Sequence, residues 1–427
     1  MKQKQASVFT RYEVFIIAIL AIIQFTVILD FMVLSPLGAI LLKELNINTS
    51  QFGLVVSAYA FSAGISGLFA AGFADKFDRK KLLMFFYIGF LAGTVLCALA
   101  PTYQFLLIAR IITGIFGGVI SSVSFAIITD LFKLELRGRV MGFVQTAFAA
   151  SQVLGIPVGL SLANNFGWHS CFWMIAIFGT IVGLVMYIYM KPIKGHLQIK
   201  SDRNALQHLG KTISHPAYLR AFLGTTLLAT GGFMLMPFGS AFSTNNLGLK
   251  MSQLPLLYGI TGAFSIFFGP IIGKLSDKIG KYRMFLIGTI ISIAMVAIYT
   301  QLGITPLWLC IMLNVILFVG ISSRMISSSA LISAIPEPQD RGAFMSVNSS
   351  VQQISGGIAS AIAGVIVVQS SSGMLERYDI LGFVVMGSMI VAAFLMYLLD
   401  RYVRKKLRIQ QMTEVVPDED KVALKTA

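Results

Sequence analysis

Three ionisable residues lie well inside long apolar stretches of this 427-residue chain: Asp30, Arg110 and Arg324. A charge at the centre of a bilayer costs about 2.5 to 3.5 kcal/mol or more, so such residues face the protein interior and mark pathways for ions or substrates. These residue types at these positions therefore predict a site for a proton or a charged solute inside a membrane.

Asp30 and Arg110 lie at comparable depth. At a rise of 1.5 Å per residue, Asp30 is about 24 Å along its helix and Arg110 is about 30 Å from Asp130 at the end of its own helix. Burial and a nearby arginine shift the pKa of a carboxyl group in opposite directions, so a partner that moves can control protonation. We expect Asp30 to carry a proton, with Arg110 as its modulator. A static ion pair that fixes helix packing is the alternative.

Arg324 lies in a serine-rich stretch that would be unusual on a lipid-facing helix: Ser322, Ser323, Ser327, Ser328 and Ser329. This composition predicts a cation that faces a substrate. The alternative is a structural arginine whose partner is a backbone carbonyl or a helix end.

Two further sets of polar residues share helical faces. Asn348, Gln352 and Ser355 are spaced i, i+4, i+7, and Gln145 and Gln152 are spaced similarly. We expect these faces to line a wet central cavity and to contact the substrate together with Arg324. Hydrogen bonding between packed helices explains the same residues without any ligand.

The elements that must position these residues are apolar helices. The chain is 56% hydrophobic and 12% charged, which is typical of an integral membrane protein. A run of about 20 apolar residues spans the hydrocarbon core. We identify twelve runs, near 14–42, 51–74, 82–100, 104–129, 139–163, 168–190, 217–243, 253–276, 284–301, 306–335, 342–368 and 379–399.

The twelve runs form two copies of a six-span unit. The charged pattern Phe-Ala-Asp-Lys-Phe-Asp-Arg-Lys at 73–80 returns 202 residues later as Leu-Ser-Asp-Lys-Ile-Gly-Lys-Tyr at 275–282. Each copy lies between the second and third spans of its half, as in secondary transporters built from internal repeats. The sequence predicts an all-α polytopic membrane protein whose twelve helices form two pseudo-symmetric six-helix bundles.

The position of lysine and arginine residues predicts the orientation. Nearly all of the 33 lie at the termini or in the loops that follow even-numbered spans; the loops on the other side carry Lys43, Lys250 and Arg377. Because cationic loops stay in the cytoplasm, we expect both termini there and the protein in the plasma membrane. The net charge of +15 is then a topology signal, and no nucleic-acid partner is expected.

These boundaries divide the chain into five parts. They are a cytoplasmic N-terminus at 1–13, the first bundle at 14–190, a cytoplasmic linker at 191–216, the second bundle at 217–400 and a cytoplasmic tail at 401–427. The basic start of the tail suits either anionic headgroups or a solvated topology anchor.

Other functional classes lack their motifs. A phosphate-binding Gly-x4-Gly-Lys-Ser/Thr loop is absent, and the four histidines fall in loops or at span ends, so neither an ATP-driven pump nor an enzyme is expected. Cys97, Cys171 and Cys310 have no paired-cysteine spacing, so we expect no metal and no disulfide framework. A transporter-like membrane sensor remains a distant alternative.

The paired loops, the pattern Arg110-x3-Gly114-x3-Gly118 and the fifth-span sequence Gly-Ile-Pro-Val-Gly at 155–159 resemble the major facilitator superfamily over about residues 10–400. Asp30, with Pro36 after it, resembles the acidic first span of the twelve-span drug/proton antiporter branch. Residues 154–159, followed by Gly-Trp at 167–168 and Phe-Trp at 172–173, are most similar to its sugar-efflux, arabinose efflux permease-like members.

The resemblance implies roles for loop residues. Asp75 and Asp277 would lock contacts between the halves in the outward-facing state, Arg79 would pair with Asp130, and Arg110 would modulate the proton site. Some positions depart from the family pattern: Ala71 and Asp78 replace the loop glycines that Gly273 and Gly280 keep, Ile156 interrupts the Gly-Pro pair, Leu160 replaces a glycine, and His169 replaces an arginine.

The sequence thus predicts an alternating-access carrier that uses the proton gradient, needs no cofactor and exports a small organic solute such as a drug or sugar. We expect it to function as a monomer in the lipid bilayer, with protons and a small molecule as its partners. Proton-coupled uptake of a small anionic or polyhydroxyl metabolite is the alternative.

Overall fold

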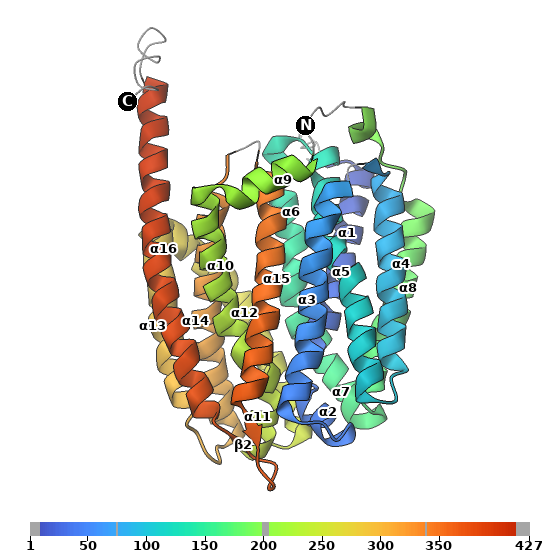
Figure 1. The fold of residues 1–427 in the computed structure, drawn as a ribbon, viewed down its shortest axis with the longest axis vertical. Helices are drawn as coiled ribbons and strands as arrows, with labels where there is room; N and C mark the ends of the chain where they lie inside the picture. Colours follow the sequence, from blue (N-terminus) through green and yellow to red (C-terminus); the bar gives the residue numbers. More distant parts are fainter. Residues whose placement is uncertain (1–8, 74–75, 199–204, 338–339, 416–427) are drawn as a thin grey trace, which may run out of the picture.

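Long helices run side by side along the length of the molecule (Figure 1). The computed structural model describes residues 9–73, 76–198, 205–337 and 340–415. The first half contains α1 (Arg11–Val33), α2 (Gly38–Glu44), α3 (Thr49–Phe73), α4 (Arg79–Ala98), α5 (Tyr103–Leu131), α6 (Leu134–Ala150), a π-helical turn (Ser151–Gly155), α7 (Ile156–Phe166) and α8 (His169–Tyr189). The linker contains a short 3-10 helix (Gly195–Gln198) and α9 (Ala205–Ser214).

The second half repeats this layout. It contains α10 (Pro216–Leu235), a 3-10 turn (Met236–Phe238), α11 (Gly239–Asn245), a second 3-10 turn (Met251–Gln253), α12 (Leu254–Ile279), α13 (Lys281–Tyr299), α14 (Leu307–Ser333), α15 (Arg341–Ile366), a hairpin of β1 (Val368–Gln369) and β2 (Leu375–Glu376), and α16 (Tyr378–Val415). The two strands are antiparallel, with Val368 opposite Glu376 and Gln369 opposite Leu375.

Eleven segments of the described chain are long and apolar enough to span a membrane, two of them made of paired helices, α6 with α7 and α10 with α11. The predicted eleventh span forms α15, which is 26 residues long and lies alongside the others in Figure 1. Its serines, glutamines and Asn348 make it a polar helix for a membrane span. The predicted all-α membrane fold of two helical bundles is confirmed.

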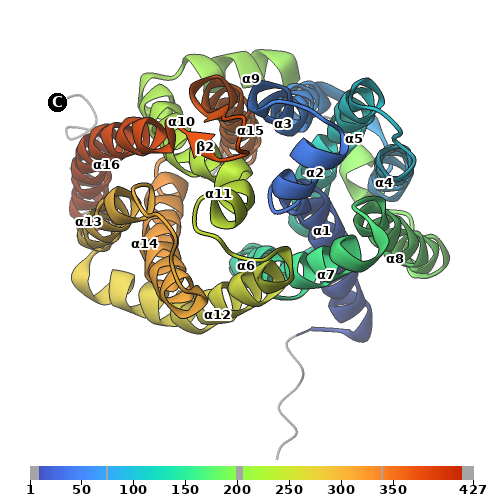
Figure 2. The same ribbon diagram turned by 90° about the horizontal axis from the view of Figure 1, so that it is seen from below.

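The two halves lie side by side and meet along two lines (Figure 2). On one side of the molecule α3 packs against α15. On the other side α7 and the π-helical turn pack against α12. The middle of the molecule lies between these two lines of contact. It is bordered by α1, α3 and α5 of the first half and by the helices of the second half.

The two ends of the bundle differ. Helix α1 begins, α16 ends and α9 crosses at one end, here named the terminal end, whereas α2, α11 and the hairpin lie at the opposite, distal end (Figure 1). Hydrogen bonds join the halves at the distal end: Ser240 Oγ donates to the Ser35 carbonyl at 3.1 Å, and Thr49 Oγ1 donates to the Val367 carbonyl at 2.5 Å.

Apolar contact between the halves is also concentrated at the distal end. Phe52 of α3 and Phe238 of the second half belong to one buried cluster, and their rings meet edge-on at 5.9 Å. Toward the terminal end the buried clusters separate. One lies in the first half around Tyr87, and the other lies in the second half around Phe344, with Leu68 of α3 at its edge. The distal end is therefore the sealed end of the molecule.

Helix α16 is longer than a membrane span. Its 38 residues extend about 57 Å at 1.5 Å per residue, against a hydrocarbon core of about 30 Å. The first part of the predicted tail therefore continues the helix. Two contacts hold this extension: the Arg404 guanidinium pairs with Asp400 one turn earlier at 2.7 Å, and Lys406 donates to the Ile335 carbonyl.

Glycines allow α5 to approach α3 closely. A Cβ atom at Gly114 would lie 2.5 Å from the Tyr59 carbonyl oxygen, and one at Gly118 would lie 2.2 Å from the Ala63 carbonyl oxygen. Backbone atoms cannot move aside as a flexible side chain can. The small-xxx-small spacing of α5 is thus a close helix crossing.

This crossing predicts that Gly118→Ala lowers the free energy of unfolding by about 1 to 3 kcal/mol, because the added methyl group forces the helices apart. The matched control is Gly387→Ala in α16, where nothing lies within 4 Å of the new Cβ. Thermal unfolding in one detergent compares the variants. Equal loss of stability in both would argue against a close crossing.

Candidate functional site

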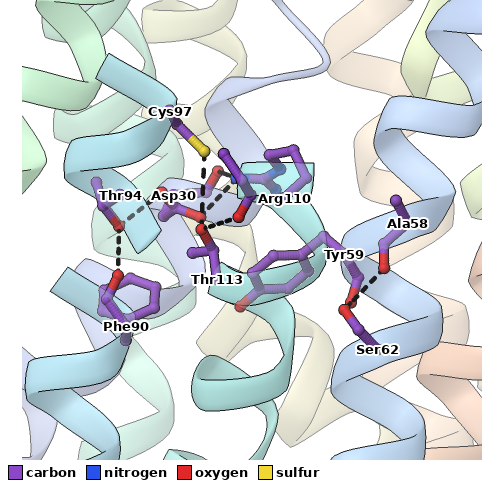
Figure 3. Close-up of polar contacts among 10 residues, drawn as sticks. Asp30, Ala58, Tyr59, Ser62, Phe90, Thr94, Cys97, Arg110 and Thr113 are labelled. Carbon is purple, nitrogen blue, oxygen red and sulfur yellow. Dashed lines mark hydrogen bonds and ion pairs between the residues drawn. The ribbon is translucent and has the colours of Figure 1, made fainter. Parts of the chain in front are cut away.

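Asp30 and Arg110 form a buried ion pair (Figure 3). Asp30 lies near the end of α1, which starts at a capping box of Thr10 and Glu13 and carries apolar residues around its whole circumference. Both charged side chains are 0% exposed, and Arg110 Nη1 lies 2.7 Å from Asp30 Oδ2. Asp30 and Arg110, which the sequence predicts to lie at comparable depth along their helices, are therefore in direct contact.

A threonine of α4 supports the carboxylate. The Thr94 hydroxyl lies 3.2 Å from Asp30 Oδ1 and 3.0 Å from the Phe90 carbonyl, and its single proton can be donated to either oxygen. Arg110 Nη1 also lies 3.4 Å from the backbone carbonyl of Asp30. Three helices, α1, α4 and α5, thus converge on one carboxylate, and the bond to Thr94 can be exchanged when the charge changes.

The guanidinium of Arg110 is only partly satisfied. Among the residues that the structure describes, its Nε and Nη2 atoms are buried without a hydrogen-bond partner. The Tyr59 ring of α3 covers the group, with its centroid 4.5 Å from Cζ. An arginine on an aromatic face gains about 2 kcal/mol when water is excluded, but this does not replace two hydrogen bonds. The Asp30–Arg110 pair is therefore held by fewer hydrogen bonds than the guanidinium could form.

The fifth-span glycines pack beside Asp30. A Cβ atom at Gly155 would lie 2.4 Å from Leu29, and one at Gly159 would lie 3.0 Å from Val33, so both glycines face α1 next to the aspartate. Between α6 and α7 the helix widens into a π-helical turn just before Pro157. In a regular α-helix the proline ring would clash with the carbonyl group four residues earlier.

A cavity of about 80 Å³ lies between α1, α3 and α5 and the polar helix α15 of the other half. Its lining is neutral and combines hydroxyl, amide and aromatic groups: Val27, Ile28, Phe31, Tyr59, Ala63, Gly117, Gly118, Ser121, Ser122, Ser349, Ser350 and Gln353. The volume holds several water molecules. Nearby, Ser121 donates to the Gln24 side chain at 3.0 Å.

The polar face predicted on α15 points to its own half. The Asn348 side chain accepts a hydrogen bond from Thr225 of α10 at 2.6 Å, and Ser355 bonds to Thr226 of α10 at 3.1 Å. Gln352 is half-buried and does not line the cavity. The adjacent face, with Ser349 and Gln353, lines it instead. The spacing found a polar face, but only the helix partners decide which face meets the cavity.

Arg324 is buried inside the second half. It is 4% exposed, its Cζ lies 5.6 Å from the Phe285 ring centroid, and its Nε and Nη2 atoms have no hydrogen-bond partner in the described part of the chain. Within the described residues no carboxylate pairs with it. It is absent from the lining of the central cavity, and a serine pair, Ser276 with Ser327 at 3.2 Å, lies one turn further along α14.

The two predicted glutamines of the fifth span lie elsewhere. Gln152 is half-buried in the π-helical turn, where the main chain approaches Gly262 of α12. The side chain of Gln145 lies outside the described residues. Gln152 does not line the cavity.

The predicted loop pair is present. Arg79 Nε lies 2.9 Å from Asp130 Oδ2, and the side chains are 5% and 18% exposed. This contact joins α4 to α5 within one half. Asp277 of the second loop pairs with Lys281 of its own half. Asp75 lies outside the described residues.

Asp78 explains why its loop does not need the family glycine. Its side chain caps α4 by accepting from the backbone of Lys80, and it accepts from the Ile193 N–H at 3.2 Å. The Arg79 N–H donates to the Ile193 carbonyl at 3.1 Å. The corresponding Gly280 has a φ of +101°, which favours glycine.

Comparison with known proteins agrees with this architecture. Residues 20–323 and 221–417 match the family model of the Major Facilitator Superfamily. The uncharacterized MFS-type transporter YceJ of Bacillus subtilis (strain 168) is 27% identical over 287 residues, which cover 66% of this chain and 72% of the relative. An uncharacterized transporter of Buchnera aphidicola subsp. Schizaphis graminum (strain Sg) is 27% identical over 224 residues, which cover 52% of this chain and 56% of that relative.

Solved structures share the fold. A bacterial homolog to the human lysosomal transporter Spinster, in an inward-facing and unoccupied conformation, has a TM-score of 0.69 at 17% identity, covering 92% of this chain and 97% of that chain. The nucleoside transporter NupG has a TM-score of 0.70 at 16% identity, covering 90% of this chain and 99% of that chain.

The buried pair predicts a distinctive stability pattern. Arg110→Gln should lower the free energy of unfolding by about 3 to 5 kcal/mol, because it leaves the Asp30 carboxylate buried without a countercharge. The double variant Asp30→Leu with Arg110→Met should recover much of this loss.

Chemical unfolding of the purified protein measures both effects. Arg404→Gln is the matched control, since it breaks a one-turn pair with Asp400 in which the arginine is 59% exposed, and one-turn helix pairs are worth only about 0.3 to 0.5 kcal/mol. If the double variant is as unstable as Arg110→Gln, the two side chains do not act as a pair.

Proposed function

Because this chain belongs to the Major Facilitator Superfamily and is a multi-pass membrane transporter, we propose that it exports a small organic solute in exchange for protons. The observation that carries the proposal is the fully buried Asp30–Arg110 pair, close to a neutral polar cavity. A static structural pair would gain from complete hydrogen bonding, whereas here two guanidinium nitrogens have none. Within the superfamily, we place the chain with the drug/proton antiporters of the sugar-efflux type.

Proton exchange at Asp30 is the proposed coupling step. With the carboxylate charged, Arg110 and Thr94 hold it and α1 is tied to α4 and α5. A proton on Asp30 removes the charge that holds the guanidinium, so the two protonation states favour different packings of these helices. A carrier that binds the proton or the solute, but not both at once, then couples proton movement in one direction to solute movement in the other.

The orientation follows from the distribution of cations. The terminal end carries most of the lysines and arginines of the loops, so we propose that it lies on the cytoplasmic side of a bacterial inner membrane. The distal end then faces outward, and its hydrogen bonds and buried aromatic rings close the outer side in this conformation. This corresponds to a state that receives solute from the cytoplasm.

The proposed solute site combines the cavity with more distant polar residues. Ser122, Ser349 and Gln353 offer neutral donors and acceptors that suit a sugar or a nucleoside-like solute. Arg324, Asn348, Gln352, Gln145 and Gln152 remain candidate contacts in other conformations. The alternative of proton-coupled uptake uses the same pair, since antiport and symport differ in the order of binding steps.

The charged loops are the proposed inner gate. Arg79 and Asp130 are bonded within the first half, so the two can move together, while Asp75 and Asp277 are the candidates for contacts across the halves. The protein is proposed to work as a monomer, because each chain contains both halves.

Asp30→Asn should abolish gradient-driven transport by at least about 100-fold while leaving solute exchange intact, because a neutral amide cannot take up the coupling proton. Proteoliposomes with an imposed pH gradient, tested against a panel of drugs, sugars and nucleosides, measure both modes. Full pH-dependent transport by the variant would refute the coupling role. Binding without counterflow in the wild type would indicate a sensor instead.

Arg324→Ala should weaken binding of an anionic or polyhydroxyl solute by about 10-fold to 150-fold, which corresponds to losing a charge-assisted hydrogen bond of about 1.5 to 3 kcal/mol. The matched control is Arg283→Ala, at an exposed position of α13. Ligand-induced thermal stabilisation over the same panel gives the affinities. Unchanged affinity would assign Arg324 a packing role alone.

A further inference from the structure

Tyr59 lies between the buried ion pair and the cavity. Its ring covers the Arg110 guanidinium at 4.5 Å, and the same residue lines the cavity. Among the described residues its hydroxyl has no hydrogen-bond partner, so this group is available to water or a solute. Tyr59 is therefore in contact with both of the places that antiport must connect.

A row of aromatic rings continues from Tyr59 into the other half. The Phe31 ring centroid lies 5.4 Å from that of Tyr59 and 5.6 Å from that of Phe233 on α10. Phe31 also lines the cavity and directly follows Asp30 in the chain. Ring pairs in this range contribute about 0.5 to 1.5 kcal/mol each beyond their buried area. The rings thus connect Arg110 to the contact between the halves.

The rings at both ends of this row pack closely against glycines of other helices. A Cβ atom at Gly117 would lie 2.6 Å from the Tyr59 hydroxyl, and one at Gly356 would lie 2.8 Å from the Phe233 ring. Movement of either ring toward its glycine would therefore displace that helix. Close-packed interiors change between discrete arrangements rather than deforming smoothly, so a small movement of Arg110 is transmitted.

The surroundings of Arg110 leave few alternative partners. The polar and titratable groups that face it are Asp30 from α1, Cys97 from α4 and Tyr59 from α3, with Thr113 on its own helix beside the thiol. When Asp30 takes up a proton, the aromatic face of Tyr59 and the backbone carbonyl of Asp30 remain to attract the guanidinium. The change of charge therefore acts first on this ring.

Building on the proposed proton coupling, we propose that Tyr59 is the positioning residue that transmits the protonation state of Asp30 to the Phe31–Phe233 contact between the halves. The aromatic face, not the hydroxyl, carries this role. A solute in the cavity touches the same two rings, Tyr59 and Phe31, and so acts on the same element as the proton.

The test measures the conformation directly and needs no solute. Spin labels at Lys133→Cys and Lys278→Cys report the distance between the exposed terminal ends of the two halves. The native cysteines Cys97, Cys171 and Cys310 are buried, so the label should react only at the two introduced positions. Distances are measured by double electron–electron resonance in lipid nanodiscs across a pH series. The wild type should show a pH-driven shift in the distance distribution, and Asp30→Asn should not.

Tyr59→Leu should lose the pH-driven shift, and Tyr59→Phe should retain it, because phenylalanine keeps the aromatic face. Phe31→Leu and Phe233→Leu should also lose it, which keeps the test decisive if Tyr59→Leu does not fold. The matched control is Phe222→Leu, which breaks the ring pair with Phe344 inside the second half and should retain the shift.

The outcomes separate the two proposals. A wild type without a pH-driven shift would refute the proton coupling and the role of Tyr59 with it. A wild type that responds, together with a Tyr59→Leu variant that responds fully, would refute only the role of Tyr59. A purely structural ring would alter stability at every pH but leave the shift in place.

Discussion

The burial of two opposite charges in a low-dielectric interior is the constraint on which the rest of this structure depends. An isolated charge inside a membrane is strongly unfavourable, so Asp30 and Arg110 must stay within contact or change their charge. That requirement brings α1, α4 and α5 together around one carboxylate. The glycines of α5 and of the fifth span pack around the pair, because the former let α3 and the latter let α1 approach closely.

The same constraint connects chemistry with movement. The two halves share a distal core of buried side chains, whereas the buried clusters toward the terminal end belong mainly to one half each. A rigid-body change between halves is then limited mostly by the distal seal and by the contacts at the centre. Phe31 and Phe233 meet at that centre, one residue away from the buried carboxylate. A change in charge at Asp30 therefore occurs beside the contact that must change.

The sequence was sufficient for the fold, because hydropathy and duplication are strong signals. Comparable depth made a contact between Asp30 and Arg110 possible, and the packing of α1 with α4 and α5 brings the two together. The cavity was harder to predict, since Asn348 and Ser349 are neighbours on α15 and only the packing of α10 decides which faces inward. Sequence periodicity gives the angle between residues on a helix but not the rotation of the helix within the bundle.

The anchoring of the linker at Ile193 gives a reason for the divergence of the two duplicated copies. In the first copy the chain turns after its sixth helix, and Asp78 holds the turning segment while it caps α4. In the second copy no segment has to be held, because α16 continues straight past Gly280, with Arg404 3.9 Å from where a Cβ would lie. The two duplicated loops thus meet different mechanical requirements. The first copy uses an anchoring carboxylate where the second copy has a glycine with a positive φ.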